Sequence, residues 1–203
     1  QGQLTKKSDD RIDLSSQFGM KASENWNYSA MLGFKTQFDE GYNYPDVSAK
    51  ISDFLSPAYL TVSLGMDYKP NDRFNIFLSP LTGKMTFVID DSLNSVGAFG
   101  VDAGKSFRAE FGGFAKMYYK QPIMKNVETQ LKIDLFSNYL KNPGNIDVNA
   151  EFLLVMKINE FLAATFNVLM IYDDDVTLLR SDDTSGPGIQ VKEVLGVGLS
   201  YKF

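Results

Sequence analysis

Cysteine and histidine are both absent from this 203-residue chain, and tryptophan occurs only once. Without cysteine there is no disulfide framework, no thiolate metal site and no cysteine nucleophile. Without histidine the chain lacks the usual general base and the commonest transition-metal ligand. Enzymes and metalloproteins that depend on either residue are therefore excluded, and we expect no cofactor.

Basic clusters and long hydrophobic runs are lacking as well. The formal net charge is −5 and no Lys/Arg-rich run appears, which argues against a nucleic-acid surface. The longest apolar stretch, residues 161–172, is interrupted by Thr165 and Asn167 and falls short of the ~18 residues of a transmembrane helix. The chain starts with Gln1-Gly2-Gln3 instead of Met or a signal peptide, which predicts a processed protein or a fragment.

What the chain has instead is strict alternation, seen most clearly at its end. From Leu195 to Phe203 the odd positions are apolar and the even positions are small or polar. This period of two predicts a strand with one apolar and one polar face. An amphipathic strand that ends on an aromatic residue resembles the closing strand of bacterial outer-membrane β-barrels, which the assembly machinery reads as an insertion signal. Tyr201 and Phe203 are the candidate signal residues.

The same alternation recurs in about nine segments, and helical periodicity is absent. The segments are residues 12–22, 26–38, 60–68, 74–87, 108–119, 127–139, 147–158, 161–172 and 194–203. Most exceed the five or six residues typical of strands in soluble sheets and match the ~9–11 tilted residues that cross a bilayer. Within 74–87 the apolar parity switches at Pro80, which predicts a β-bulge.

The connections are of two kinds, as in outer-membrane barrels. Residues 23–24, 69–72 and 159–160 are predicted tight turns, whereas 39–56, 90–106 and 173–190 are long and polar. Two connections fit less well: 121–126 is a longer turn on the short side, and 141–145 is short on the long side. Glycines between Gly97 and Gly104 suit a tight outer loop that folds over the barrel mouth.

Aromatic residues gather near the predicted strand ends and would form two girdles at the membrane interfaces. The short-turn group is Trp26, Tyr28, Tyr68, Phe74, Tyr119, Phe161, Tyr201 and Phe203. The long-loop group is Phe34, Phe38, Phe87, Phe107, Tyr139 and Tyr172.

Strand number bears on domain organisation. Bacterial single-chain barrels have an even number of strands, whereas about nine are visible here. Either a short strand near residues 47–54 completes the set, or residues 1–203 are the C-terminal portion of a single longer barrel domain. We favour the second interpretation and expect about ten to twelve strands in the complete barrel.

Several motifs resemble one known family. They are DDRIDL at residues 9–14, WNYSAMLGFKTQF at 26–38, FLSPLTGK at 77–84, GAFGVD at 97–102, DLFSNYL at 134–140 and IYDDD at 171–175. The chain resembles a Bacteroidota outer-membrane β-barrel family catalogued as domain of unknown function 3078. The resemblance implies a porin-like fold in a Gram-negative outer membrane and extra strands ahead of Gln1. It implies no activity and no catalytic residues.

Charged residues on the polar faces would line the lumen. The candidates are Lys35, Asp67, Lys84, Arg108, Glu110, Lys132, Asp134 and Glu151. The carboxylates of Glu110, Glu128, Asp134 and Glu151 are candidates for acid–base chemistry across the lumen. The alternative, which we favour, is that they pair with Arg108, Lys116, Lys132 and Lys157.

A calcium site is a weaker candidate. Asp173, Asp174 and Asp175, with Asp182 and Asp183, concentrate carboxylates in one predicted outer loop. Calcium prefers several oxygen ligands, but the spacing fits no EF-hand. We therefore predict no resident metal.

The sequence predicts an all-β, transmembrane, antiparallel up-and-down β-barrel of the cell outer membrane. We expect a non-enzymatic structural or accessory subunit of an outer-membrane complex, whose lumen is largely plugged because opposed charges attract strongly in a low-dielectric interior. The alternative is a passive channel or transporter for small solutes. Expected partners are outer-membrane lipid, the barrel-assembly machinery and other outer-membrane proteins, and not nucleic acid.

Overall fold

The computed structural model describes residues 10–42, 46–179 and 185–199. The regular secondary structure of these residues is β-strand, apart from one short α-helix, α1 (Asp91–Ser95), and one 3-10 turn, η1 (Ala98–Gly100). No helix in these ranges is long and apolar enough to cross a membrane.

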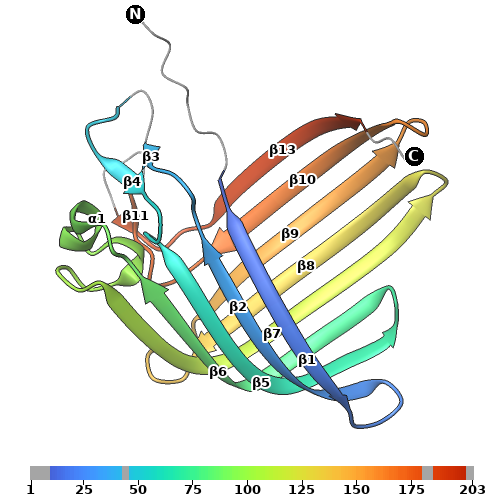
Figure 1. Cartoon of the computed structure of the whole chain (residues 1–203), viewed down its shortest axis with the longest axis horizontal. Coiled ribbons are helices and arrows are strands. Elements are labelled where there is room, and N and C mark those ends of the chain that lie inside the picture. The colour runs from blue at the N-terminus through green and yellow to red at the C-terminus, as the bar shows by residue number, and fades with distance from the viewer. Residues whose placement is uncertain (1–9, 43–45, 180–184, 200–203) are drawn as a thin grey trace, which may run out of the picture. The chain divides into compact units, whose positions relative to one another are not determined.

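Nine strands form one sheet and follow one another across it in chain order, β1-β2-β5-β6-β7-β8-β9-β10-β13; the four short strands of the connections are left out of it (Figure 1). Their bounds are β1 (Ile12–Lys21), β2 (Trp26–Thr36), β5 (Ala58–Asn71), β6 (Phe74–Phe87), β7 (Phe107–Met124), β8 (Val127–Asn138), β9 (Ile146–Lys157), β10 (Leu162–Tyr172) and β13 (Gln190–Leu199). The pairings from β7 to β13 are antiparallel. The predicted all-β class and up-and-down strand order are confirmed.

Two small sheets lie in the connections. Strands β3 (Gly41–Tyr42) and β4 (Lys50–Ser52) pair with each other, as do β11 (Leu178–Leu179) and β12 (Ser185–Gly186). Residues 47–54 therefore do contain a strand, but it pairs outside the nine-stranded sheet. The alternative in which this segment supplies a tenth strand of that sheet is wrong.

The predicted turn at residues 121–126 is also wrong. Strand β7 continues to Met124 and β8 starts at Val127, so only Lys125 and Asn126 connect them. Asn126 has a φ of 68°, a left-handed conformation that asparagine tolerates well. The pairing shifts by one residue between Pro122 and Met124, which lets the strand continue past a proline that has no N–H to donate. The connection is thus a tight turn, which fits the asymmetry of the ends better than the sequence suggested.

The chain divides into two compact units. Unit 1 comprises residues 1–18, 30–63 and 82–111, and unit 2 comprises residues 19–29, 64–81 and 112–203. In unit 1, Leu32 is 50% exposed and Val62 is 42% exposed, whereas Ser63 and Thr82 are completely buried and joined by a 2.9 Å hydrogen bond between their hydroxyls. Neighbouring residues along one strand thus show the reverse of the usual burial.

Unit 2 repeats this inversion. Leu64 and Leu78 are 53% and 41% exposed, whereas Asp67 and Ser79 are buried. We call the face with the exposed leucines and valines the apolar face, and the face with the buried serines, threonines and charged residues the polar face. Water-soluble sheets place their apolar residues against a core instead. The polar face is not uniformly polar, since buried Phe77 also lies on it and contacts Phe114 at a ring-centroid distance of 6.5 Å.

The predicted aromatic groups are confirmed in part. In unit 2, Trp26 and Tyr68 lie 4.7 Å apart between ring centroids, and Tyr68 also contacts Phe74. In unit 1, Phe87 and Phe107 lie 5.2 Å apart. Each group joins residues of different strands near the same kind of connection, as two girdles require.

The predicted bulge at Pro80 is visible in the burial pattern of β6. Phe77 and Ser79 are buried, Pro80 and Leu81 are both exposed, and burial resumes at Thr82. Two successive residues on the same face mark one extra residue in the strand. A side chain on Gly65 of β5 would meet the carbonyl oxygen of Leu78 at 2.1 Å. The β6 backbone before the bulge thus approaches β5 so closely that only glycine fits at this position.

We predict that Gly65→Ala destabilises the fold by about 1–3 kcal/mol, the usual cost of overpacking, because the obstructing atoms are backbone. Gly83→Ala is the matched control on β6, since a side chain there meets nothing within 4 Å. The measurement is the urea-unfolding midpoint by circular dichroism. Equal midpoints for the two variants would contradict the close approach at the bulge.

Candidate functional site

The polar face carries the chemistry-bearing side chains, and in unit 1 they centre on Glu110. Its side chain is 2% exposed and lies on β7. Its Oε2 atom accepts a hydrogen bond from Nη2 of Arg108 at 2.6 Å and lies 3.8 Å from Nζ of Lys84 on β6. Burying a carboxylate without cations would cost several kcal/mol, so both contacts are needed for its burial.

Arg108 also connects this cluster to the long loop at residues 90–106. Its Nη1 atom donates to the carbonyl oxygen of Gly100 in η1 at 3.0 Å. The same loop encloses a small apolar cluster of Val88, Leu93 and Val101, against which Ala98 and Phe99 pack. The glycine-containing segment is thus a folded loop held to a strand. Whether it covers a barrel mouth stays a prediction.

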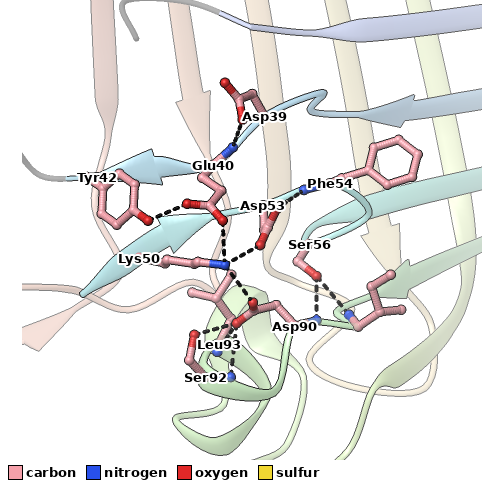
Figure 2. A network of polar contacts seen from close by, with 11 residues as sticks. Asp39, Glu40, Tyr42, Lys50, Asp53, Phe54, Ser56, Asp90, Ser92 and Leu93 are labelled. Carbon is pink, nitrogen blue, oxygen red and sulfur yellow. Dashed lines mark hydrogen bonds and ion pairs between the residues drawn. The ribbon is translucent and has the colours of Figure 1, made fainter. Parts of the chain in front are cut away.

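A second network ties the loops of unit 1 around Lys50 of β4 (Figure 2). Nζ of Lys50 lies 2.7 Å from Oδ2 of Asp53, 3.0 Å from Oε1 of Glu40 and 3.3 Å from Oδ2 of Asp90. Tyr42 donates to the same Glu40 carboxylate. One cation therefore joins the β3–β4 pair to the start of α1.

Asp90 has a second role as the N-cap of α1. Its Oδ1 atom accepts from the backbone N–H groups of Ser92 at 3.0 Å and Leu93 at 3.1 Å, and from the Ser92 hydroxyl. These groups would otherwise be unpaired at the first turn. The loop before α1 is fixed by Ser56, whose hydroxyl oxygen accepts from the N–H groups of Ile89 and Asp90, both at 2.8 Å.

The network sets the charge states of its members. Hydrogen bonds from Ser92 and Leu93, together with Lys50, hold the pKa of Asp90 well below its ordinary value. Hydrogen bonds to Asp53 and Glu40 raise the pKa of Lys50. The contribution of Asp90 is present above its unfolded pKa of about 4 and that of Lys50 below its unfolded pKa of about 10. The network is therefore intact throughout the range between those values.

In unit 2 the polar face carries a different chain of contacts. Nζ of Lys132 on β8 lies 3.2 Å from Oε2 of Glu151 on β9, and Nδ2 of Asn167 on β10 donates to Oε1 of Glu151 at 2.9 Å. The register places Lys132 directly opposite Glu151. The side chain of Lys132 is 49% exposed, so this pair contributes much less to stability than the Glu110 cluster.

The eight predicted lumen residues fall into separate groups. Lys84, Arg108 and Glu110 cluster together, and Lys132 pairs with Glu151. Lys35 lies 3.9 Å from Asp13, and Asp67 accepts from Nδ2 of Asn75 at 2.7 Å. Asp134 lies opposite Lys116 in the register.

One predicted neighbourhood is wrong. The sequence placed Arg108 and Glu110 beside Lys132 and Asp134. In the structure, however, the last residue of β8, Asn138, lies opposite Gly112 of β7, so Arg108 and Glu110 precede the paired part of β7. Lys132 lies opposite Tyr118, which follows Glu110 by eight residues along β7. The extended β7–β8 hairpin, with its turn at Lys125-Asn126, moves the register away from the expected one.

The predicted pairing of carboxylates with cations is confirmed for Glu110 with Arg108 and for Glu151 with Lys132. Glu128 instead contacts Lys120, at 3.0 Å, which the sequence did not single out. Each of these carboxylates thus faces a cation, which favours a structural role over proton transfer.

The acidic loop lies only partly within the described residues. Asp175 faces Nζ of Lys141 at 2.8 Å, and Asp174 accepts from Asn145 at 2.5 Å. No group of three or more acidic residues that could hold a metal ion occurs in the ranges described. Asp182, Asp183 and the candidate signal residues Tyr201 and Phe203 lie outside those ranges.

The Lys50 network was missed at the level of sequence. Asp90-Asp91-Ser92 before an apolar residue is an available helix-start signal, since aspartate is a favoured N-cap. The contact of Lys50 with a residue 40 positions away depends on how two loops fold and has no local signal.

We predict that Glu110→Gln destabilises the protein by about 3 kcal/mol, because it leaves two mostly buried cations, Arg108 and Lys84 with 17% and 15% side-chain exposure, facing a neutral group. Asp102→Asn is the control. It removes a carboxylate that contacts Lys105 at 2.9 Å, but both side chains are more than half exposed, so we expect no measurable change. The readout is the urea midpoint, and a similar small shift in both variants would contradict the importance of burial.

We predict that Asp90→Ala raises the amide hydrogen-exchange rate of Leu93 roughly fivefold, since an N-cap contributes about 1 kcal/mol. Asp91→Ala removes a carboxylate of the first turn that caps neither Ser92 nor Leu93, so the rate should rise less than in Asp90→Ala. In the unaltered protein, the protection factor of Leu93 should be constant from about pH 5 to 8, because neither Asp90 nor Lys50 titrates there. A protection factor that falls within this range would contradict the assigned charge states.

The comparisons with known proteins give one similarity. Residues 1–42 match the family described as "Protein of unknown function (DUF3078)". No curated protein matches the chain, and no solved structure matches it. The family resemblance drawn from the sequence is therefore confirmed at its N-terminal part, and this family carries no described activity.

Proposed function

We propose that this chain is an integral outer-membrane β-barrel protein with a packed, non-catalytic interior, which acts as a structural or accessory subunit of an outer-membrane complex. The observation that carries the proposal is the inverted burial. Along single strands of each unit, leucine and valine are exposed while serine, threonine, aspartate and glutamate are buried.

The inversion is too extensive for a surface in contact with water. Exposed apolar side chains recur on most strands of the sheet, among them Leu32 (50%) on β2, Leu64 (53%) on β5 and Phe111 (41%) on β7, whereas the edge strands β1 and β13 are exposed on both faces. Each large apolar side chain left in water forgoes roughly 1.5–3 kcal/mol relative to burial. Soluble monomers rarely expose continuous apolar patches beyond a few hundred Å². A hydrocarbon surrounding removes this cost, and strands of 10 to 18 residues are long enough to cross it.

The packed polar face supports a closed interior. Counted as whole residues, Thr86 of β6 is completely inaccessible, Phe77 is 1% exposed and Glu110 is 5% exposed. A water-filled pore would leave side chains of this face hydrated. The folded loop around Val88, Leu93 and Val101 adds further packing in unit 1. The outer-membrane location itself is supported by the family resemblance of the sequence motifs.

The second candidate is a passive channel for small solutes. It is favoured by charged pairs of the polar face that stay hydrated, notably Lys132 at 49% and the Lys35–Asp13 pair at 38% and 36% side-chain exposure. A polar, hydrated lining is what water-filled barrels have.

The test starts with the full-length protein and phospholipid vesicles. We expect the protein to float with the vesicles in a density gradient, to resist extraction by high salt and carbonate, and to be released by detergent. Recovery as a salt-soluble monomer would contradict membrane integration, because the apolar face would then have to face water.

Planar-bilayer recording of the same preparation separates the two candidates. The packed interior predicts little or no steady conductance. Conductance in the nanosiemens range that scales with salt concentration would contradict the closed interior and favour the channel.

A further inference from the structure

The apolar face is not flat: unit 2 contains a groove of about 390 Å³ in it. Its floor is formed at Gly113 and Ala115 of β7, whose side chains are too small to fill the space. Its walls include Leu78 and Pro80 of β6, Leu135 of β8 and Ile146 of β9. The register places Ala115 directly opposite Leu135, so the floor and one wall lie on adjacent strands.

Two backbone features create the hollow. The bulge in β6 ends the regular alternation at Pro80, and Gly113 leaves the surface of β7 bare. The hydroxyl of Tyr139 lies over that bare position, since a side chain on Gly113 would meet it at 2.6 Å. Tyr139 thus covers one part of the groove, and the space beside Ala115 is left open.

The two serine hydroxyls that line the groove already have hydrogen-bond partners within the protein. The Ser137 hydroxyl donates to the carbonyl oxygen of Pro143 at 2.7 Å, and the Ser79 hydroxyl donates to the carbonyl oxygen of Leu64 at 2.8 Å. The remaining lining residues are apolar apart from the Tyr139 hydroxyl. A bound peptide strand would bring N–H and C=O groups that find no partners here, at a cost of several kcal/mol each in hydrocarbon. The chemistry of the groove thus favours an occupant that is apolar along its length.

Size points in the same direction. A helix with a diameter of about 10 Å and a pitch of 5.4 Å occupies roughly 400 Å³ per turn, so the groove would take barely one turn. A methylene group displaces about as much volume as a water molecule, roughly 30 Å³, so the groove holds on the order of a dozen methylenes. That is close to the length of one lipid acyl chain.

We propose that this groove binds one acyl chain of a membrane phospholipid, with the head group at the end where Tyr139 and the loop after it lie. This inference rests on the proposed membrane function, because the groove is continuous with the apolar face. Lys141 follows Tyr139 by two residues; its side chain is 65% exposed and its ammonium is paired with Asp175 at 2.8 Å, so a phosphate at this end would share the cation with that carboxylate.

The experiment uses the full chain in phosphatidylethanolamine vesicles that contain a small fraction of the same lipid with a photoreactive diazirine on one acyl chain. After irradiation, adducts are mapped by peptide mass spectrometry, and lipids retained in mild detergent are counted by native mass spectrometry. We expect adducts at Leu135, Tyr139 and Ile146 to exceed those at Leu64 severalfold, and one phospholipid to be retained.

Matched variants test the site itself. Ala115→Leu fills the groove and should abolish both the excess labelling and the retained lipid. Ala109→Leu adds the same side chain to the same face of β7, outside the groove, and should change neither. Uniform labelling, or a retained lipid that persists in Ala115→Leu, would overturn the proposal.

Other outcomes distinguish failure of the acyl-chain site from failure of the proposed membrane function. Groove labelling that disappears as the protein-to-lipid ratio is raised would show that a second copy of the chain covers the groove, which also overturns the lipid assignment. If the protein floats with the vesicles but is labelled evenly, the proposed membrane function stands and the acyl-chain site is contradicted. If the protein does not float, both the proposed membrane function and the acyl-chain site are contradicted.

Discussion

Alternation of side chains along an extended strand is the constraint on which this structure depends. Successive residues face opposite sides, so a strand of a given sequence fixes the character of both faces at once. Here the accessible side is apolar and the inaccessible side is polar, in unit 1 as in unit 2. Backbone pairing between neighbouring strands satisfies the N–H and C=O groups, which leaves the side chains to match two different surroundings.

The polar face is stabilised by local pairing and not by one continuous network. The Glu110 cluster is almost fully buried, whereas the Lys132–Glu151 pair is half open to solvent, so contacts of similar length differ greatly in energy. The Lys50 network organises loops instead of strands. Its three carboxylates come from chain segments that approach only because β3, β4 and α1 fold together.

Much of the architecture follows from the sequence, because a period of two is a local property. It predicted all nine strands of the main sheet and the parity switch at Pro80, and the structure confirms them. The end of β7 was misplaced, because Pro122 is a normal signal for a strand end and only the shifted pairing with β8 lets the strand continue. The contacts within the candidate site depended on register and loop folding, which no short pattern encodes. The sequence thus identified the charged residues of the polar face and several of their partners, but it placed Arg108 beside the wrong strand and missed Lys50.

The extra residue at Pro80 limits how this strand can change during evolution. Because Pro80 and Leu81 share one face, removing one of them would restore plain alternation and leave Thr82 and Thr86 on the buried side. A one-residue deletion elsewhere in β6 would instead keep the bulge and turn the side chains on one side of the gap to the opposite face. Single-residue gaps are therefore tolerated in this strand only at the bulge itself, where the close approach to Gly65 would be relaxed as well.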